Sequence, residues 1–459
     1  MGDNHSQVAY KGILGYNSNV FKTKNQPIMK NFHINGGKPL KGSISVSPAK
    51  NSSVAILCAS VLVRQKTTLN NMPQIQEVDR IIELIESIGV KVTRKDERTV
   101  VIDSTGPLDL QHIDKEACKK TRSSLMLLGA LAPHVSSYHI YKTGGCKLGE
   151  RTVRPHMYAL EQLGVTAVSK TTHYEVTNKK LVGTDIVMYE SGDTPTENAI
   201  MAAAMAKGTT TIQFASSNYM VQDLCHFLVN AGAKIEGIGT TTLTITGVKS
   251  FKKSSYAIMP DPIVAMTWLS LGITTKSTLT VKDVPLDFLA LEMKKMEVMG
   301  QTFIIKNKRK NEAQTFTLAD VTVKPSTLIA LPDKIYGRPF PGLNIDSLPL
   351  FIPILTQAKG RTLVHDWVYE NRAIYYMEFQ KLGAKPFLVD AHRVFIEGKT
   401  PLKGTDLTCL PALRPAVAIL IAMIAAKGSS TLRNCYMIER GYENLVESLQ
   451  AIGVDIKES

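Results

Sequence analysis

Lys50 is the first of three features whose residue types could act on an anionic substrate. It follows Pro48 and Ala49 and stands just ahead of the apolar segment 54–63. A lysine at a helix start lies beside free backbone N–H groups, and that combination suits a phosphate or a carboxylate. The alternative is a surface lysine beside an ordinary helix cap, and Lys50 taken alone does not decide between the two.

The second feature is the segment 144–151 (GGCKLGER), in which three glycines surround Cys146. This composition predicts a mobile loop, and Lys147 and Arg151 supply positive charge that favours the thiolate. A structural cysteine is the alternative, but such a residue usually lies in an apolar run, as Cys58 does. The loop therefore favours a reactive thiol.

The third feature is a set of arginines in half-polar, turn-like settings. Arginine is suited to a bidentate grip on phosphate and carboxylate, although surface ion pairing is the more common role of any single arginine. Asp346 follows a Pro/Gly loop and begins an apolar stretch, where a helix cap is the alternative explanation. The arginines are Arg122, Arg151, Arg372, Arg414 and Arg440.

A repeated phrase organises the elements that must position these residues. In each copy a helix-like apolar pattern ends at a glycine, and a short strand pattern follows directly. The intervals between these glycines are 75, 68, 68, 83 and 70 residues. Glycine fits there because a helix C-terminus often needs a residue with positive φ. The glycines are Gly89, Gly164, Gly232, Gly300, Gly383 and Gly453.

A second phrase accompanies several copies, in which a helix end runs into a Thr-rich strand, as at 207–212 and 427–432. Self-similarity at a near-constant period predicts six α+β units of about 70 residues each. Six such units could form one solenoid or two closed domains of three units, and the period alone does not choose between them.

Composition limits the classes of function. The 459 residues are 44% hydrophobic and 20% charged, which is typical of a globular protein. A net charge of +14 fits a nucleic-acid binder or an enzyme with anionic ligands. The basic residues are spread along the chain, and only 306–310 (KNKRK) forms a cluster, which we interpret as a solvated hairpin. Aromatic residues are not interleaved with the basic ones, so the sequence disfavours nucleic-acid binding.

The sequence also predicts where the protein works. Its longest apolar run, 416–426, is far shorter than the roughly 20 residues of a membrane helix. The six cysteines show no metal-ligand spacing, and the first residues do not resemble a signal peptide, so we expect a reducing cytoplasm and no metal site. Residues 1–29 are polar and unpatterned, and we expect them to be a flexible extension.

Four motifs together resemble the UDP-N-acetylglucosamine enolpyruvyl transferase family, which acts in bacterial peptidoglycan synthesis. The resemblance runs from about residue 30 to the end of the chain, in the family's order and spacing. The related enolpyruvylshikimate phosphate synthases lack the cysteine loop and typically carry Lys-Ser in place of Lys50-Asn51, so they match less well. The motifs are Ala49-Lys50-Asn51, the loop 144–151, Glu370-Asn371-Arg372 and Arg440-Gly441-Tyr442-Glu443.

The resemblance implies the fold that the repeats leave open. It is an α+β, two-domain inside-out α/β barrel built from six βαβαββ-type units, with helices inside and sheets outside. Residues 30–49 and 260–459 would form the first, discontinuous domain. Residues 50–259 would form the second domain, which carries the Cys146 loop. The active site would lie between the domains and close on ligand.

The family's residue roles carry over as implications of the resemblance. Lys50, Arg151 and Arg440 would hold the phosphate and carboxylate of phosphoenolpyruvate, with Arg372 and Arg414 nearby. The partners would be phosphoenolpyruvate and a nucleotide-sugar or related acceptor. The resemblance calls for no metal and no organic cofactor, and the oligomeric state stays open.

Proton transfer would depend on two further residues. Cys146 would protonate the methylene carbon of phosphoenolpyruvate, and it could instead form a covalent adduct. Asn51 and Asp346 would bind the acceptor hydroxyl, with Asp346 as the base. The hydroxyl would add to give a tetrahedral ketal, from which phosphate leaves. The remaining positions expected to bind substrate are Arg122, Thr152, Val153, Arg154, Gly192, Asp193 and Val368.

Several acceptor-side positions depart from the family's usual residues. Arg154 stands where an Asp usually faces the uracil ring, and Glu190 stands where a Lys usually meets the diphosphate. A carboxylate beside a diphosphate is electrostatically unfavourable. The other departures are Gly192-Asp193-Thr194 for a Ser-Val-Gly type turn, Pro262 for an Arg, and Leu343-Asn344-Ile345 for Phe-Pro-Thr.

Three hypotheses follow from the sequence. The first is enolpyruvyl transfer to UDP-N-acetylglucosamine, and the second is the same transfer to a different nucleotide or sugar in a secondary pathway. The third is a non-catalytic basic binding protein that retains the fold. The presence of all the residues expected around the pyruvyl group argues against the third hypothesis.

Overall fold

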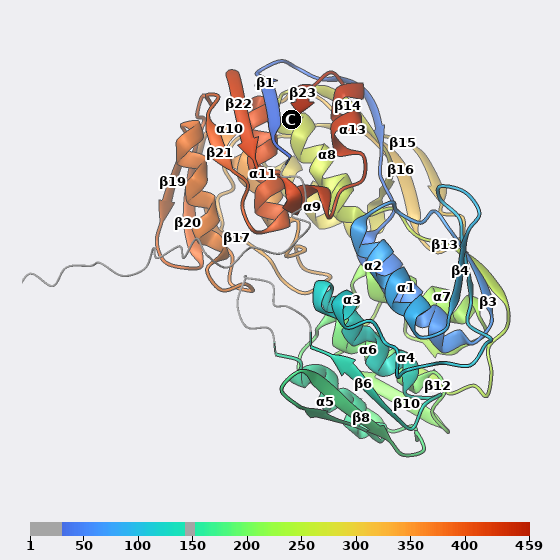
Figure 1. The fold of residues 1–459 in the computed structure, drawn as a ribbon. Helices are drawn as coiled ribbons and strands as arrows, with labels where there is room; N and C mark the ends of the chain where they lie inside the picture. The colour runs from blue at the N-terminus through green and yellow to red at the C-terminus, as the bar shows by residue number, and fades with distance from the viewer. Residues whose placement is uncertain (1–29, 143–151) are drawn as a thin grey trace, which may run out of the picture.

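The computed structural model describes residues 30–142 and 152–459. The predicted N-terminal extension and the whole cysteine loop 144–151, with Cys146 and Arg151, lie outside the described residues. Figure 1 shows two lobes, an upper one and a lower one, each with helices inside and small sheets outside. We call them the upper and the lower lobe.

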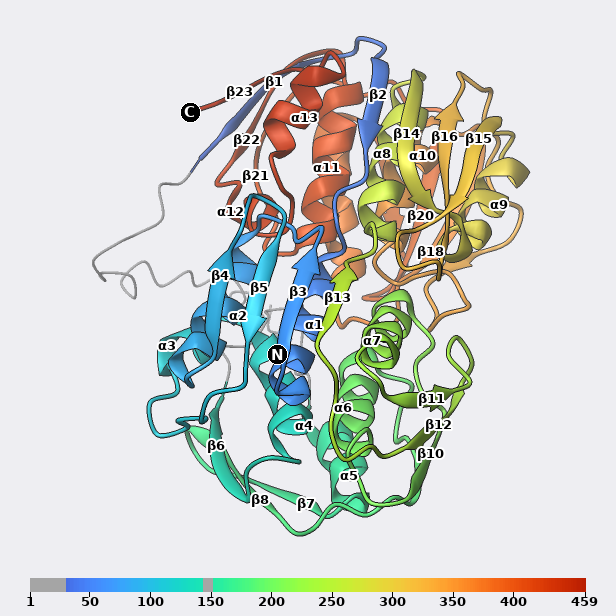
Figure 2. The same ribbon diagram turned by 90° about the vertical axis from the view of Figure 1, so that its right-hand side faces the viewer.

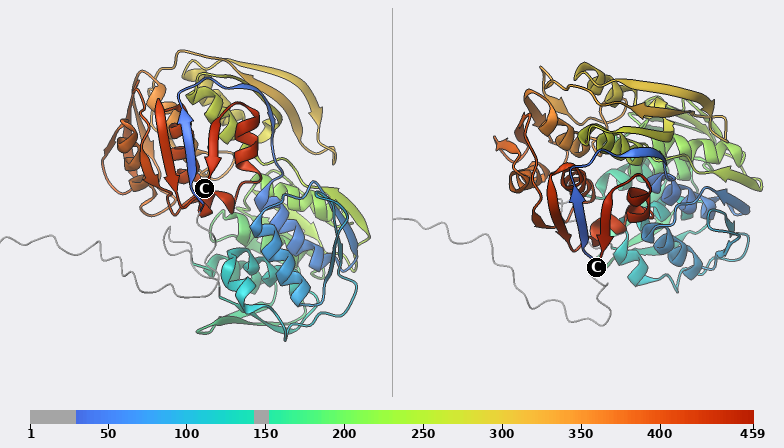
Figure 3. Two further views of the ribbon diagram at one scale, coloured as in Figure 1. Left: turned by 45° about the horizontal axis from the view of Figure 1, so that its top comes forward. Right: turned by 90° about the horizontal axis from the view of Figure 1, so that it is seen from above.

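Three four-stranded sheets surround the upper lobe. In spatial order, the first two sheets are β21 (Asp406–Thr408), β22 (Gly428–Arg433), β1 (Phe32–Gly36) and β23 (Asp455–Glu458), and then β15 (Phe303–Lys310), β16 (Thr317–Val323), β14 (Thr278–Pro285) and β2 (Lys41–Ser45). The third sheet consists of β17 (Ile335–Tyr336), β18 (Gly360–His365), β20 (Arg393–Gly398) and β19 (Lys385–Leu388). Figure 3 shows β1 and β23, the first and last strands of the described chain, side by side.

The lower lobe has two four-stranded sheets and one three-stranded sheet. The four-stranded sheets are β13 (Ser254–Ala257), β3 (Lys66–Asn70), β5 (Val100–Asp103) and β4 (Lys91–Arg94), and then β11 (Lys234–Glu236), β12 (Thr242–Thr246), β10 (Thr209–Gln213) and β9 (Asp185–Val187). The three-stranded sheet consists of β6 (Ser137–Tyr141), β8 (His173–Asn178) and β7 (Val165–Ser169).

The six sheets share one plan, which confirms the predicted six units. Each four-stranded sheet joins a parallel edge pair to two antiparallel pairs. The three-stranded sheet has the two antiparallel pairs, and within residues 30–142 and 152–459 no parallel strand joins it. All six predicted glycines have positive φ, between 85° and 107°, and each precedes an edge strand: β4, β7, β11, β15, β19 or β23. Residues with a Cβ rarely adopt this conformation, so the regular spacing of these glycines in the sequence follows the repeat of the structural units.

Six helices fill the interiors of the lobes. α8 is buried along its whole length, and α11 and α1 are buried along most of theirs, because these segments are apolar on all sides. The predicted arrangement of helices inside and sheets outside is therefore confirmed. The central helices are α1 (Lys50–Val63), α4 (Leu127–Leu131) and α6 (Asp193–Ala203) in the lower lobe, and α8 (Pro262–Thr274), α10 (Leu348–Gln357) and α11 (Leu413–Ala425) in the upper lobe.

A second set of helices lies outside the central ones. Most are amphipathic α-helices that end at the repeat glycines, but the segment before Gly383 is a 3₁₀ helix, η3. The outer helices are α2 (Gln76–Ser87), α5 (Arg154–Gln162), α7 (Tyr219–Asn230), α9 (Ala290–Val298), η3 (Arg372–Leu382) and α13 (Leu445–Ala451). The short connecting helices are α3 (Lys115–Lys120), η1 (Arg122–Met126), η2 (Leu286–Phe288) and α12 (Tyr436–Glu439).

The two lobes exchange strands at one point. β2 leads into α1 but pairs with β14 of the upper lobe, and β13 leads into α8 but pairs with β3 of the lower lobe. The two connections touch at a bridge between Pro48 and Pro260, and Figure 2 shows them passing from lobe to lobe. This exchange supports the predicted domain boundaries near residues 50 and 260, which stay a prediction.

Two sequence interpretations concern the surface. Residues 306–310 lie in β15, which is exposed and pairs antiparallel with β16, as expected for a solvated hairpin. In the part of the chain that the structure describes, every helix is too short or too polar to cross a membrane.

Candidate active site

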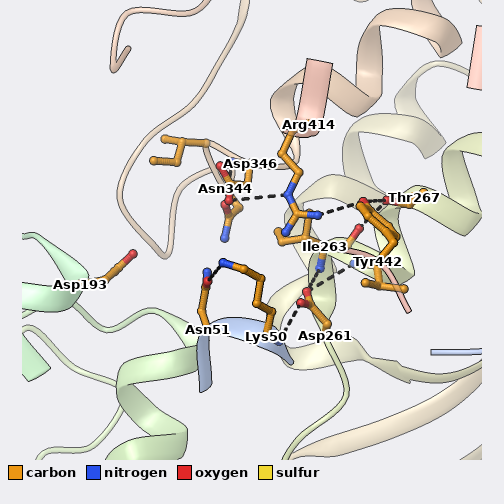
Figure 4. Close-up of polar contacts among 12 residues, drawn as sticks. Lys50, Asn51, Asp193, Asp261, Ile263, Thr267, Asn344, Asp346, Arg414 and Tyr442 are labelled. Atoms are coloured by element: carbon orange, nitrogen blue, oxygen red, sulfur yellow. Dashed lines mark hydrogen bonds and ion pairs between the residues drawn. The ribbon is translucent and has the colours of Figure 1, made fainter. Parts of the chain in front are cut away.

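Lys50 lies at the start of α1, where the two lobes meet. The preceding residue, Ala49, offers no side-chain cap; instead the Lys50 backbone N–H donates to Oδ2 of Asp261 at 3.3 Å. Asp261 Oδ1 accepts from the backbone N–H groups of Ile263 at 2.7 Å and Val264 at 3.3 Å (Figure 4). One buried carboxylate therefore caps α1 of the lower lobe and α8 of the upper lobe together, and burial raises its pKa.

A group of cations gathers around Lys50. Burial lowers the pKa of the Lys50 ammonium, Glu77 acts against this shift, and Arg414 and Arg440 reinforce it. Arg440 Nε lies 3.1 Å from Glu77 Oε2 and thus links the two lobes. Because all these charges act on Lys50, the structure brings three of the predicted anion-binding residues to one site.

Glu77 is the counter-charge of this cationic group, and the sequence analysis missed it. Its side chain is buried at the start of α2 and accepts a hydrogen bond from the Thr121 hydroxyl. Burial acts to raise its pKa, but Lys50 and Arg440 outweigh burial, and the pKa of Glu77 is lowered. In the sequence, an acidic residue in the first turn of a helix is explained by its favourable interaction with the helix dipole. Nothing in the sequence therefore set Glu77 apart from other such residues.

Arg414 lies on the upper-lobe side of the site at the start of α11. It is buried, its Nη1 donates to the Tyr442 hydroxyl at 2.9 Å, and its Nε lies 3.8 Å from Asp346 Oδ2. The Tyr442 hydroxyl also lies 2.7 Å from Thr267 Oγ1 of α8. Figure 4 shows Arg414 and Asp346 above Lys50 and Asn51. Arg414 thus connects the cations with the predicted base.

Arg372 supports the loop of the predicted base. It is almost fully buried, and its guanidinium donates to both carboxylate oxygens of Asp366, at 2.6 and 2.8 Å. Its Nη2 donates to the carbonyl of Ile345 at 2.7 Å, and its Nη1 lies 3.9 Å from Asp346 Oδ1. Because Asp366 fixes the guanidinium through two of its donors and Ile345 takes a third, Arg372 is placed to orient Asp346.

Amides and carboxylates line the acceptor side of the site. Asn51 Nδ2 donates to the Tyr219 hydroxyl at 3.2 Å. Asp193, the first residue of α6, accepts from Ser216 Oγ at 2.6 Å and from Asn218 Nδ2 at 3.2 Å. Burial raises the pKa of Asp193, and the charge of Asp346 across the lobes acts in the same direction.

Other predicted positions lie farther out. Arg122 Nη2 donates to the carbonyl of Thr152 at 3.3 Å, which joins η1 to the segment ahead of α5. Arg154 and Val368 are exposed. Among the residues that the structure describes, no hydrogen bond or ion pair joins either of these two to Lys50 or Asp346. The remaining two positions cap helices, Val153 at α5 and Gly192 at α6.

The residues described offer no metal site, since they contain no cluster of three or more His, Cys, Asp or Glu side chains that could hold an ion. At the junction of the lobes a cationic group lies beside carboxylates and amides. Such a site can hold a small dianion and remove a proton from a neutral partner.

Comparisons with known proteins agree with this chemistry. A family model described as EPSP synthase (3-phosphoshikimate 1-carboxyvinyltransferase) matches residues 34–449. The UDP-N-acetylglucosamine 1-carboxyvinyltransferase of Bacteroides thetaiotaomicron is 32% identical over 93% of this chain and 99% of its own length. The enzyme of that name from Bradyrhizobium diazoefficiens is 33% identical over 92% of this chain and 97% of its own.

Solved structures give the same fold. The enolpyruvyl transferase NikO from Streptomyces tendae has a TM-score of 0.82 and 25% identity, covering 94% of this chain and 99% of its own. EPSP synthase from Acinetobacter baumannii has a TM-score of 0.73 at 16% identity, with 94% and 100% covered, and supports the fold alone. The hypothesis of a non-catalytic binding protein is therefore wrong. The chain belongs to the enolpyruvyl transferase family, whose enzymes transfer the enolpyruvyl group of phosphoenolpyruvate to an acceptor.

Proposed function

We propose that this enzyme transfers the enolpyruvyl group of phosphoenolpyruvate to a hydroxyl of UDP-N-acetylglucosamine and releases phosphate, a step of peptidoglycan synthesis. The observation that carries the proposal is the meeting of Lys50, Arg414 and Arg440 with Asp346 at the junction of the lobes. The acceptor is taken from relatives that are 32 to 33% identical over nearly the whole chain.

The cationic group would hold phosphoenolpyruvate by its two anionic ends. Lys50 and Arg440 come from different lobes, so a dianion between them would draw the lobes together. Glu77 balances these charges without substrate, since its carboxylate lies 3.1 Å from Arg440. The incoming phosphate or carboxylate would compete with Glu77 for Arg440. Preorganised positive charge would then stabilise the charge on the departing phosphate.

The reaction needs two proton transfers before phosphate leaves. Cys146 would give its thiol proton to the methylene carbon of phosphoenolpyruvate, while Asp346 takes the proton of the acceptor hydroxyl. The hydroxyl oxygen then bonds to the central carbon, which gives a tetrahedral ketal. Breakage of the carbon–oxygen bond to phosphate, with removal of a proton from the new methyl group, yields the enolpyruvyl ether and inorganic phosphate. Positioned acids and bases contribute roughly 10²- to 10⁴-fold to such steps.

Incubation with phosphoenolpyruvate and UDP-N-acetylglucosamine tests the proposal. We expect phosphate release in step with a new enolpyruvyl nucleotide sugar detected by mass spectrometry. Cys146→Ala should abolish turnover, whereas Cys58→Ala, in the buried part of α1, is the matched control for loss of a thiol. Phosphate release only with another acceptor would contradict the choice of UDP-N-acetylglucosamine and leave the reaction type in place.

One observation favours a second candidate, the same transfer to a different nucleotide or sugar. Glu190 is exposed just ahead of Gly192 and Asp193, so this edge of the acceptor side carries negative charge. A nucleotide diphosphate would meet repulsion there. An acceptor panel that includes nucleoside monophosphates and uncharged sugars distinguishes the candidates, because the second predicts faster release with an acceptor of lower negative charge.

A further inference from the structure

Glu292 is a buried carboxylate close to the predicted base, and the function does not yet account for it. It lies on α9 with 2% of its surface exposed. Its Oε1 accepts a hydrogen bond from the backbone N–H of Asn344 at 3.1 Å. Burial raises the pKa of Glu292 to about 7. A carboxylate is seldom fully buried, so its placement under this loop needs a reason.

Asn344 connects Glu292 with the predicted base and with the lower lobe. Its Oδ1 accepts from the backbone N–H of Asp346 at 2.9 Å, and its Nδ2 donates to Asn218 Oδ1 at 3.4 Å. Asn218 caps α7 in the lower lobe and donates in turn to Asp193 at 3.2 Å. A continuous path of hydrogen bonds therefore runs from Glu292 through Asn344 and Asn218 to Asp193.

The path and Arg372 hold different backbone groups of the loop. Arg372 donates to the carbonyl of Ile345, whereas Glu292 and Asn344 accept from the backbone N–H groups of Asn344 and Asp346. Three neighbouring residues of the loop are thus held by buried or half-buried groups. Hydrogen bonds in such a protected place hold their geometry better than exposed ones.

We propose that Glu292 and Asn344 are positioning residues for Asp346, and that the bond from Asn344 to Asn218 couples that position to the lower lobe. Asp346 would then be correctly aimed only when the lobes are together. This inference rests on the proposed function, because it takes Asp346 as the base. The inference is specific to this chain, in which Asn344 stands where the family usually has a proline. A proline there would have neither the backbone N–H that donates to Glu292 nor the side-chain amide that contacts Asn218.

Steady-state kinetics of four variants tests the positioning role. Asn344→Ala removes both side-chain bonds, and Glu292→Leu removes the acceptor of the loop. Each should lower kcat about tenfold, the effect of one lost buried hydrogen bond, while KM for phosphoenolpyruvate changes by less than about twofold. Glu292→Gln keeps an acceptor oxygen and should remain near wild type. Glu297→Gln, exposed on the same helix, is the matched control.

The double variant Glu292→Leu with Asn344→Ala sharpens the test. Both residues act through Asp346, so the kcat of the double variant should be close to that of the less active single variant. It should not fall by the product of the two separate losses. If Glu292→Leu does not fold, Asn218→Ala with Asn344→Ala replaces it, because Asn218 is the next member of the path.

The outcomes separate this inference from the proposed function. If the wild type is active and both Asn344→Ala and Glu292→Leu keep its kcat, the positioning role is overturned and the proposed function stands. Equal losses in Glu292→Gln and Glu292→Leu also overturn it, because they would show that charge and not the hydrogen bond is needed. No phosphate release by the wild type with any acceptor overturns the proposed function and the positioning role together.

Discussion

The two sides of the candidate site differ in the chemical groups that line them. On the anion side, Lys50, Arg414 and Arg440 carry full charges, which Glu77 partly balances. On the acceptor side, Asn51 and its neighbours form a network of amides, hydroxyls and carboxylates. Charges act over several ångströms and tolerate small displacements, whereas amide networks depend on each partner. The anion side can therefore stay constant while the acceptor side varies.

Asp346→Asn should give the largest effect and acts on the acceptor side. The amide cannot take the hydroxyl proton, so we expect kcat to fall by roughly 10²- to 10⁴-fold, the usual contribution of a positioned base. Phosphoenolpyruvate should still bind, which isothermal calorimetry measures directly. Asp390→Asn, in an exposed turn of the upper lobe, is the control. Loss of phosphoenolpyruvate binding in Asp346→Asn would break the division into two sides.

Lys50→Met tests the anion side. Loss of one preorganised cation should lower kcat/KM by about 10²- to 10³-fold, through weaker binding of phosphoenolpyruvate and a less stabilised leaving phosphate. The KM for the acceptor should change far less. Lys66→Met, exposed in β3, is the matched control. An increase in the KM for the acceptor alone would show that Lys50 acts on the acceptor and not on phosphoenolpyruvate.

The repeats and motifs predicted the fold, and the structure brings three of the predicted cationic residues together. The six glycines are visible in the sequence because a positive φ restricts the residue type, and all six have that conformation. Lys50, Arg414 and Arg440 carry full charges and stand in distinctive motifs. The family resemblance implied that they share one site, and the residue types alone left this open.

The residues that sequence reasoning missed are of ordinary types in ordinary settings. Glu77 resembles a first-turn acid, Asp261 resembles a single helix cap, and Glu292 lies in a helix with other charged residues. Their roles depend on partners far away in the sequence: Glu77 pairs with Arg440, Asp261 caps α1, and Glu292 accepts from Asn344. Arg372 has a partner that its motif did not indicate, since the structure pairs it with buried Asp366, and its expected contact with substrate stays a prediction.

Glu77→Gln should produce a smaller effect that appears in the pH profile. Glu77 raises the pKa of Lys50 against burial, so its neutralisation should lower that pKa further. Lys50 would then lose its proton at a lower pH, and the alkaline limb of kcat/KM should move to lower pH. Glu83→Gln, exposed on the same helix, is the control. A shift toward higher pH would contradict the assigned balance of charges.

Arg98→Ala should give the smallest effect and acts on neither side, because this residue links the lobes away from the chemistry. Arg98, in the turn between β4 and β5, lies 2.7 and 2.8 Å from the two carboxylate oxygens of Glu443 in the upper lobe. The side chain of Arg98 is 43% exposed, whereas that of Glu443 is only 4% exposed, so solvent screens the pair in part. Its loss should raise KM for both substrates about two- to fivefold.

Salt should identify this link. Wild-type KM should rise with ionic strength toward that of Arg98→Ala, because screening weakens the same ion pair. Arg94→Ala removes a neighbouring ion pair with Asp79 that stays within the lower lobe, and it should leave KM unchanged. Equal effects of the two arginine variants would mean that general surface charge, and not contact between the lobes, governs substrate binding. A change in one substrate's KM alone would assign Arg98 to that side of the site, since a link that only holds the lobes together must affect both substrates.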